Sequence, residues 1–178
     1  KRISKTLESL PLNEIEFLIN RIKDLETAKG TVYVIGNGGS AALANHFVTD
    51  IGVGGLKYGR AINAISLVSN ISSLTATAND YGYQYAFSRE LEIKSLSTKD
   101  LLIMISSSGN SLNLIEAVSI AKRRGVETFA ILGFDGGKLK LNQYFNTFRD
   151  QARTSGGLIR DLAKQQVALQ NAVLQPLG

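Results

Sequence analysis

The chain has 178 residues, 44% of them hydrophobic and 20% charged, which fits one globular domain (1–178) with a sizeable core. It has no cysteine, which excludes disulfides and thiolate metal sites, and no apolar run approaches the roughly 20 residues of a membrane span. No apolar signal core follows the basic start, so we expect a cytoplasmic protein with no membrane partner. The net charge of +5 is scattered apart from residues 122–124, and we therefore expect no nucleic-acid partner.

Residues 6–28 carry apolar side chains at largely helical spacing, interrupted near Pro11. This pattern predicts one broken or two short amphipathic helices, as an N-terminal helical segment (1–29) in front of a core at 30–178. In that core, apolar runs typical of buried strands alternate with helical patterns. The alternation indicates an α/β three-layer sandwich with a mostly parallel five-stranded sheet flanked by helices. The expected strands lie at 31–35, 62–68, 101–105, 128–132 and 144–148, and the expected helices at 40–51, 70–78, 84–96, 111–124 and about 158–174.

The first expected strand ends in a glycine turn with the sequence Gly36-Asn37-Gly38-Gly39-Ser40. Glycines let backbone N–H groups approach a ligand, and a helix N-terminus favours negative charge, so this turn predicts an anion site. Two other interpretations stay open, namely a tight turn that binds nothing and a dinucleotide-binding fingerprint. The fingerprint lacks its acidic residue, because the next strand ends in serine and asparagine at 69–70. No Gly-Lys-Ser/Thr sequence is present, which excludes a Walker loop.

A second turn of the same kind follows the expected strand at 101–105. This serine loop, residues 106–111, has the sequence Ser106-Ser107-Ser108-Gly109-Asn110-Ser111. Ligands of parallel α/β sheets bind beyond the carboxyl ends of the strands, where both turns lie. We therefore expect one phosphorylated, hydroxyl-rich ligand between the two turns, held by hydroxyls that can both donate and accept. The simpler alternative is a loop that only caps the next helix, through Ser111 or Asn110.

Polar side chains near these turns are candidates for acid–base chemistry. His46 and Asp50 are four residues apart and share one face of the expected helix, although this spacing also fits a solvent-facing pair or half of a zinc site. Asn79 and Asp80 follow the expected helix at 70–78, where an Asx turn is the alternative to a ligand contact. Glycines within residues 52–55 predict a flexible loop after the first core helix.

Five motifs between about residues 30 and 140 resemble, in order and spacing, those of the sugar isomerase (SIS) domain family, and within it those of the phosphoheptose isomerases. They are Gly36-Asn37-Gly38-Gly39-Ser40, then His46-Phe47, then Ala78-Asn79-Asp80-Tyr81-Gly82-Tyr83 with Phe87-Ser88-Arg89, then Ile105-Ser106-Ser107-Ser108-Gly109-Asn110-Ser111, and Asp135-Gly136-Gly137-Lys138.

The resemblance implies an aldose–ketose isomerase that interconverts sedoheptulose 7-phosphate and an aldoheptose 7-phosphate through an enediol, for lipopolysaccharide or capsule precursors. It implies that Asp50 is the general base, with His46 beside it. It also implies a homotetramer whose ligand is the phosphorylated sugar. We expect no required cofactor and no metal ligands; zinc stays open as an alternative, although relatives that bind zinc use a second histidine that this chain lacks. The implied substrate-binding residues are Asn37, Gly38, Gly39, Ser40, Asn79, Asp80, Ser106, Ser107, Ser108 and Ser111.

The tail departs from the family. Phosphoheptose isomerases carry a glutamine or glutamate and then a histidine on the last helix, whereas residues 158–174 contain no histidine. One alignment places Gln166 and Asn171 at these positions, and another places Arg160 and Asp161 there. Two alternatives to heptose isomerisation therefore stay open: a non-catalytic SIS regulator or adaptor that binds a sugar phosphate, and an isomerase of another sugar phosphate.

Overall fold

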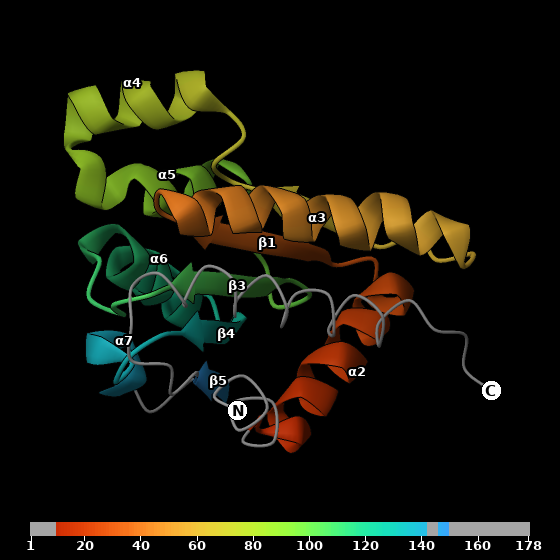
Figure 1. Cartoon of the computed structure of the whole chain (residues 1–178). Helices are drawn as coiled ribbons and strands as arrows, with labels where there is room; N and C mark the ends of the chain where they lie inside the picture. Colours follow the sequence, from red (N-terminus) through yellow and green to blue (C-terminus); the bar gives the residue numbers. More distant parts are fainter. Residues whose placement is uncertain (1–9, 142–145, 150–178) are drawn as a thin grey trace.

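A sheet of five parallel strands forms the middle of the molecule (Figure 1). The computed structural model describes residues 10–141 and 146–149, and the strand order within them is β2-β1-β3-β4-β5. Each neighbouring pair is parallel, which confirms the expected α/β sheet. The strands are β1 (Thr31–Gly36), β2 (Asn63–Ser66), β3 (Leu101–Ser106), β4 (Glu127–Leu132) and β5 (Asn146–Arg149).

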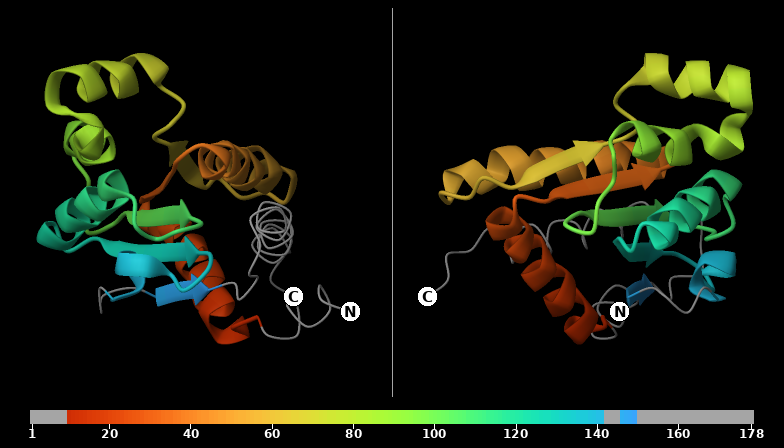
Figure 2. Two further views of the ribbon diagram at one scale, coloured as in Figure 1. Left: turned by 60° about the vertical axis from the view of Figure 1, so that its left-hand side comes forward. Right: turned by 180° about the vertical axis from the view of Figure 1, so that it is seen from behind.

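Helices cover both faces of this sheet and complete the expected three layers (Figure 2). In the described residues they are α2 (Leu12–Ala28), α3 (Gly39–Lys57), α4 (Ile71–Tyr81), the short 3-10 helix η1 (Tyr83–Tyr85), α5 (Ala86–Ile93), α6 (Leu112–Arg123) and α7 (Gly137–Leu141). One face packs against α2 and α3, and the other against α5 and α6. α4 lies outside these layers, beyond α5 (Figure 1).

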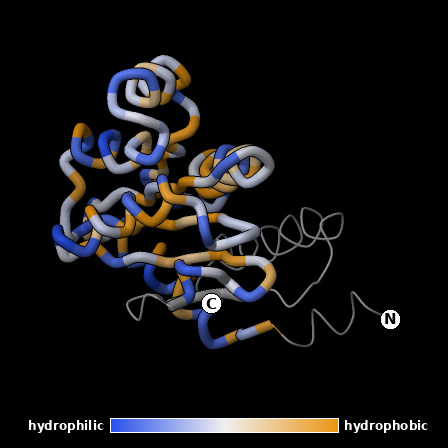
Figure 3. The backbone as a smooth tube through the Cα atoms, turned by 90° about the vertical axis from the view of Figure 1, so that its left-hand side faces the viewer, coloured by the Kyte–Doolittle hydropathy of each residue, from blue (hydrophilic) through white to orange (hydrophobic). Residues whose placement is uncertain are grey.

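The central strands are buried on both faces, which explains their continuous apolar sequence. β1 and β3 are buried along their whole length. Successive side chains of β1 enter opposite cores: Val32 and Val34 join the cluster with α2 and α3, while Tyr33 and Ile35 join the cluster with α5 and α6. In Figure 3 the hydrophobic colour follows the inner segments of the tube, and the hydrophilic colour lies largely on outer turns and helix surfaces.

Helix α2 begins directly after Pro11, at the break that the sequence predicts. Its buried side chains include Ile22 and Leu25, which pack against the sheet. Arg21 of the same helix donates from Nε to the Glu127 carboxylate at 2.5 Å and so ties α2 to the start of β4. The first part of the expected N-terminal helical region, at 6–9, lies outside the described residues.

Helix α3 is longer than expected, and the predicted flexible loop at residues 52–55 is wrong. The helix continues through these residues to Lys57. Phe47, Ile51 and Gly55 form one buried stripe along it. Packing of this stripe on the sheet outweighs the low helix propensity of glycine, which costs about 1 kcal/mol per residue relative to alanine.

Other element boundaries differ by a few residues. α4 continues to Tyr81, so Asn79 and Asp80 lie in its last turn and not after it, as was expected. The expected helix at 84–96 is divided into η1 and α5, because the chain leaves α4 through Gly82 at a φ of 96°. β5 falls where a strand is expected at 144–148, whereas the expected helix at about 158–174 lies outside the described residues.

The strand order places a change of direction in the chain connections between β1 and β3. From β1 the chain passes through α3 to β2, and from β3 it passes through α6 to β4, so the two connections leave adjacent strands on opposite faces. This divergence is the topological switch point at which open α/β sheets bind ligands. Within 10–141 and 146–149, no helix has both the length and the apolar character that a bilayer crossing requires.

Candidate functional site

The glycine turn (residues 36–40) and the serine loop lie side by side at the switch point. Gly36 of β1 pairs with Ile105 of β3, so the glycine turn and the serine loop follow adjacent strands at nearly the same level. Two hydrogen bonds then join the turn to α6: Asn37 Nδ2 donates to Asn113 Oδ1 at 2.9 Å, and Asn113 Nδ2 donates to Asn37 Oδ1 at 2.8 Å. The structure thus brings the two predicted turns together.

The glycine turn is tightly folded around small residues. A side chain at Gly36 would lie 2.7 Å from the carbonyl oxygen of Ser40, so the turn requires glycine there. Gly38 has a φ of 53° at the N-cap of α3 and has open space around it. Gly38 and Gly39 are exposed, and Ser40 is partly exposed in the first turn of the helix. This arrangement fits approach of an anionic ligand to the start of α3.

The hydroxyls of the serine loop fall into two groups. Ser106 is buried, and its Oγ accepts a hydrogen bond from the Gly109 N–H at 3.0 Å, so this hydroxyl stabilises the loop itself. The exposed Ser108 accepts from the Asn110 N–H at 3.2 Å. Ser111, one of the two candidates for the cap, takes the N-cap position of α6, but its side chain makes no capping bond. Within the described part of the chain, the Ser107 and Ser111 hydroxyls have no hydrogen-bond partner and are therefore suited to bind phosphate oxygens.

A neighbouring segment, residues 133–139, which includes the start of α7, braces the serine loop. Asn110 Oδ1 accepts from the Lys138 N–H at 3.0 Å, and the Gly109 carbonyl accepts from the Leu139 N–H at 2.9 Å. The two loops also touch through glycines, since a side chain at Gly109 would lie 2.0 Å from the carbonyl oxygen of Gly136. This contact gives a structural role to the fifth motif, at 135–138.

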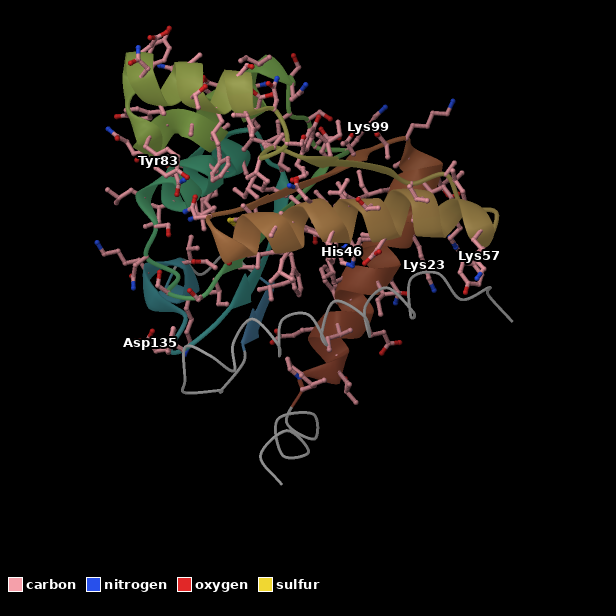
Figure 4. The ribbon with its side chains drawn as sticks, turned by 45° about the horizontal axis from the view of Figure 1, so that its top comes forward. Lys23, His46, Lys57, Tyr83, Lys99 and Asp135 are labelled. Atoms are coloured by element: carbon pink, nitrogen blue, oxygen red, sulfur yellow. The ribbon has the colours of Figure 1, made fainter. Side chains whose placement is uncertain are left out.

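His46 and Asp50 pair with each other along α3. His46 Nε2 lies 3.5 Å from Asp50 Oδ2, and the two side chains are 69% and 14% exposed. At 1.5 Å of rise per residue, they lie about 9 Å and about 15 Å along the helix from Ser40. Figure 4 shows His46 midway along α3, whereas Tyr83 and Asp135 lie toward the end where the strands finish. No described contact joins this pair to the serine loop.

Asn79 and Asp80 are exposed in the last turn of α4, where Asn79 Nδ2 donates to Asp80 Oδ1 at 2.8 Å. This pair is not joined to the serine loop by any described contact. The chain that follows does reach the site, because the Tyr83 hydroxyl donates to Asn37 Oδ1 at 2.9 Å.

Two residues at this site, Asn113 and Tyr83, are not among the predicted site residues. A signal for Asn113 exists in the sequence, since it falls four and eight residues before Ala117 and Ala121 on the buried face of α6. A buried amide at such a position requires a polar partner. Tyr83 belongs to a family motif, but its contact with Asn37, 46 residues away, follows only from the fold.

The described residues near the site offer few side chains that could bind a metal ion. His46 and Asp50 could supply two, but no cluster of three or more His, Cys, Asp or Glu side chains exists within residues 10–141 and 146–149. A zinc site on this pair therefore needs a ligand from elsewhere. The predicted metal independence remains a prediction.

A hollow of about 570 Å³ lies at the other end of α6 from the serine loop. It is lined by Lys122, Arg123, Gly125, Val126 and Thr128. Because it contains no carboxylate, histidine or clustered hydroxyls, it does not offer the groups that sugar isomerisation requires.

Comparison with known proteins gives a consistent result. A family model described as the SIS domain matches residues 1–133. The phosphoheptose isomerase of Helicobacter pylori is 43% identical over 139 residues, which are 78% of this chain and 71% of the relative. A probable phosphoheptose isomerase of Thermoplasma acidophilum is 41% identical over 132 residues, covering 74% and 72% of the two chains.

Solved structures agree with these sequence relatives. The phosphoheptose isomerase GmhA of Neisseria gonorrhoeae superimposes with a TM-score of 0.86 at 27% identity, over 97% of this chain and 91% of that one. A phosphoheptose isomerase of Francisella tularensis, at 24% identity, shares the fold with a TM-score of 0.88, over 97% and 90% of the two chains. The joined glycine turn and serine loop are the regions whose motifs resemble this family. The chain belongs to the SIS domain family and, within it, to the phosphoheptose isomerases.

Proposed function

We propose that this chain is an isomerase that interconverts sedoheptulose 7-phosphate and an aldoheptose 7-phosphate through an enediol. The observation that carries the proposal is the junction of the glycine turn and the serine loop at the switch point, in a chain of the phosphoheptose isomerase family. A phosphorylated sugar fits this junction because it offers an anion for the helix starts and hydroxyls for the polar side chains.

In this proposal the serine loop holds the phosphate. Ser107, Ser108 and Ser111 are all at least partly exposed and lie in the loop that leads into α6. Hydrogen bonds to a charged phosphate are about twice as strong as bonds between neutral groups. Ser106 and the brace at 133–139 keep the loop in shape, which reduces the entropy lost when the ligand binds.

The proposed general base is the Asp50 carboxylate. Isomerisation requires removal of a carbon-bound proton next to the carbonyl and its return to the neighbouring carbon, while donors stabilise the enediol oxygens. His46, 3.5 Å from Asp50, is the group beside it that can orient the carboxylate. Because Asp50 lies about 15 Å along α3 from Ser40, a sugar anchored at the serine loop must extend along this helix to meet it.

The base is tested by Asp50→Asn, which keeps the shape of the side chain but cannot accept the proton. Turnover of sedoheptulose 7-phosphate should be lost while the sugar phosphate still raises the melting temperature. Asp24→Asn, at an exposed position on α2, is the matched control and should keep wild-type turnover. Retention of most of the wild-type kcat in Asp50→Asn would show that another group is the base.

The same assay separates the alternatives. A regulator or adaptor would bind the sugar phosphate without turnover, and an isomerase of another sugar phosphate would turn over a different substrate. We further propose a homotetramer that supplies heptose for lipopolysaccharide or capsule precursors. The expected cytoplasmic location and the absence of a required cofactor stay predictions.

A further inference from the structure

Three elements meet at the side chain of Asn37. It belongs to the glycine turn after β1, and it contacts Asn113 in the first turn of α6 and Tyr83 of η1. Asn37 Oδ1 accepts from Asn113 Nδ2 at 2.8 Å and from the Tyr83 hydroxyl at 2.9 Å. Asn37 Nδ2 donates to Asn113 Oδ1 at 2.9 Å. These bonds link segments that are 46 and 76 residues away from Asn37 in the sequence.

The hydrogen-bonding capacity of Asn37 is almost filled by these contacts. A carboxamide oxygen has two lone pairs, and Tyr83 and Asn113 occupy both. The amide nitrogen has two hydrogens, and the bond to Asn113 uses one of them. One N–H is therefore all that the side chain of Asn37 can offer to a ligand.

The exposed fractions of the three residues fit an arrangement in which Asn113 and Tyr83 hold the side chain of Asn37 in place. Asn113 is 3% exposed, so it acts from inside the fold and cannot be a surface contact. Asn37 is partly exposed beside Gly38 and Gly39, at the mouth of the site. Tyr83 is 50% exposed, and its hydroxyl contacts Asn37 Oδ1. In Figure 4 its side chain lies toward the end of the molecule where the strands finish.

We infer that Asn113 and Tyr83 are positioning residues. They occupy both lone pairs of the side-chain oxygen of Asn37, so that the Asn37 side chain meets the ligand only as a hydrogen-bond donor. The ligand atom against it is then an acceptor oxygen, such as a phosphate, carbonyl or enediolate oxygen. The identity of the ligand as a sugar phosphate rests on the proposed function. The hydrogen-bonded arrangement of the three residues does not.

The first experiment needs no ligand. In ¹H–¹⁵N spectra of the full chain, Tyr83→Phe should shift the side-chain amide signals of both Asn37 and Asn113, because one acceptor site of Asn37 is vacated. Tyr85→Phe, on the same 3-10 helix, is the matched control, since its hydroxyl has no hydrogen bond within the described residues, and it should leave both signals in place. Unchanged amide signals in Tyr83→Phe would overturn the inference.

The second experiment tests the role in turnover. Tyr83→Phe should lower kcat/KM for sedoheptulose 7-phosphate by about 3- to 10-fold, the range expected for one neutral hydrogen bond, and Tyr85→Phe should not. If Tyr83 acts through Asn37, its substitution should have no further effect in an Asn37→Ala background. A full additional loss in that background would mean that Tyr83 contacts the substrate itself, which would overturn the positioning role.

The third comparison tests the donor role of Asn37. Asn37→Asp preserves size and can still accept from Tyr83 and Asn113, but it offers no N–H to a ligand, loses the bond to Asn113 Oδ1 and adds a negative charge. It should therefore impair sugar-phosphate binding more than Asn37→Ala does. Equal or better binding by Asn37→Asp would contradict the inference.

The outcomes for the ligand and for the positioning residues can be separated. A wild-type protein that neither turns over nor binds sedoheptulose 7-phosphate would overturn the proposed function. The positioning inference would then be decided by the amide spectra and by inorganic phosphate, for which the same order of binding among the Asn37 variants is expected. Asn113→Leu removes the other partner of Asn37 and should also weaken binding. If Asn113→Leu does not fold, the Tyr83→Phe variant still decides the inference.

Discussion

Within the serine loop, residues of one type occupy different environments and should have different roles. Ser106 is buried and accepts from the backbone N–H of Gly109. Ser111 is partly exposed at the head of α6 and makes no capping bond. The first hydroxyl therefore contributes to the stability of the loop, and the second is available to a ligand.

Substitution of these two serines by alanine should separate stability from binding. Ser106→Ala leaves a buried N–H without its acceptor and should lower the free energy of unfolding by about 1–3 kcal/mol in urea titrations. Ser111→Ala should leave stability nearly unchanged but weaken binding of sedoheptulose 7-phosphate by about 10- to 150-fold, from the loss of one bond to a charged group. Ser72→Ala, at an exposed position on α4, should change neither. Wild-type affinity in Ser111→Ala would place the phosphate elsewhere.

At the scale of elements, the serine loop depends on its contact with the segment at 133–139. Gly109 has a φ of 65°, and a side chain there would lie 2.0 Å from the Gly136 carbonyl oxygen. The contact thus requires glycine for two reasons, namely the backbone conformation and the lack of space.

A pair of glycine variants distinguishes these two reasons. Gly59 has a similar φ of 72°, but a Cβ at this position would have no neighbouring atom within 4 Å. Gly59→Ala should therefore cost only the strain of a left-handed residue, roughly 1–2 kcal/mol. Gly109→Ala should cost clearly more and also reduce sugar-phosphate binding. Equal melting temperatures for the two variants would show that the two loops are not in the contact described.

The elements themselves could largely be predicted from the sequence, because the runs at 32–35 and 101–105 are apolar throughout, as buried parallel strands require. The exception, at residues 52–55, shows the limit of local reasoning. Glycine-rich sequence favours a loop, but the helix continues because Gly55 extends the buried stripe of Phe47 and Ile51. That stripe becomes visible only when α3 is packed on the sheet.

The candidate site could be predicted in part. Strand–turn–helix patterns indicate the glycine turn and the serine loop, and the strand order then places them together. The link through Asn37, Asn113 and Tyr83 could not be predicted, since it joins three segments whose approach depends on the whole fold. Likewise, helical spacing places His46 and Asp50 on one face, but it does not say which part of the ligand they meet.

At the scale of the whole molecule, α2 and α3 expose large apolar side chains on their surface. Leu12 of α2 is 68% exposed, and Val53 and Leu56 of α3 are 69% and 67% exposed. Exposed apolar surface of this kind is typical of assembly sites. It fits the proposed homotetramer, and we propose that these helices lie between its subunits.

Light scattering at micromolar concentration should accordingly give the mass of four chains. Leu56→Lys should reduce the assembled fraction, because it places a charge in the interface. Ile93→Lys changes a side chain of the same exposure, 67%, on α5 and serves as the control that should remain assembled. A wild-type monomer under these conditions would contradict the proposed assembly.

The central claim is that this chain moves a carbon-bound proton of a heptose phosphate. Sedoheptulose 7-phosphate incubated with the wild-type protein in deuterium oxide, and followed by NMR, tests it directly. An enediol mechanism predicts that the proton next to the carbonyl is replaced by deuterium as an aldoheptose 7-phosphate accumulates, and that Asp50→Asn prevents both changes. A sugar phosphate that binds to the wild-type protein but keeps its proton and forms no aldose would contradict the account.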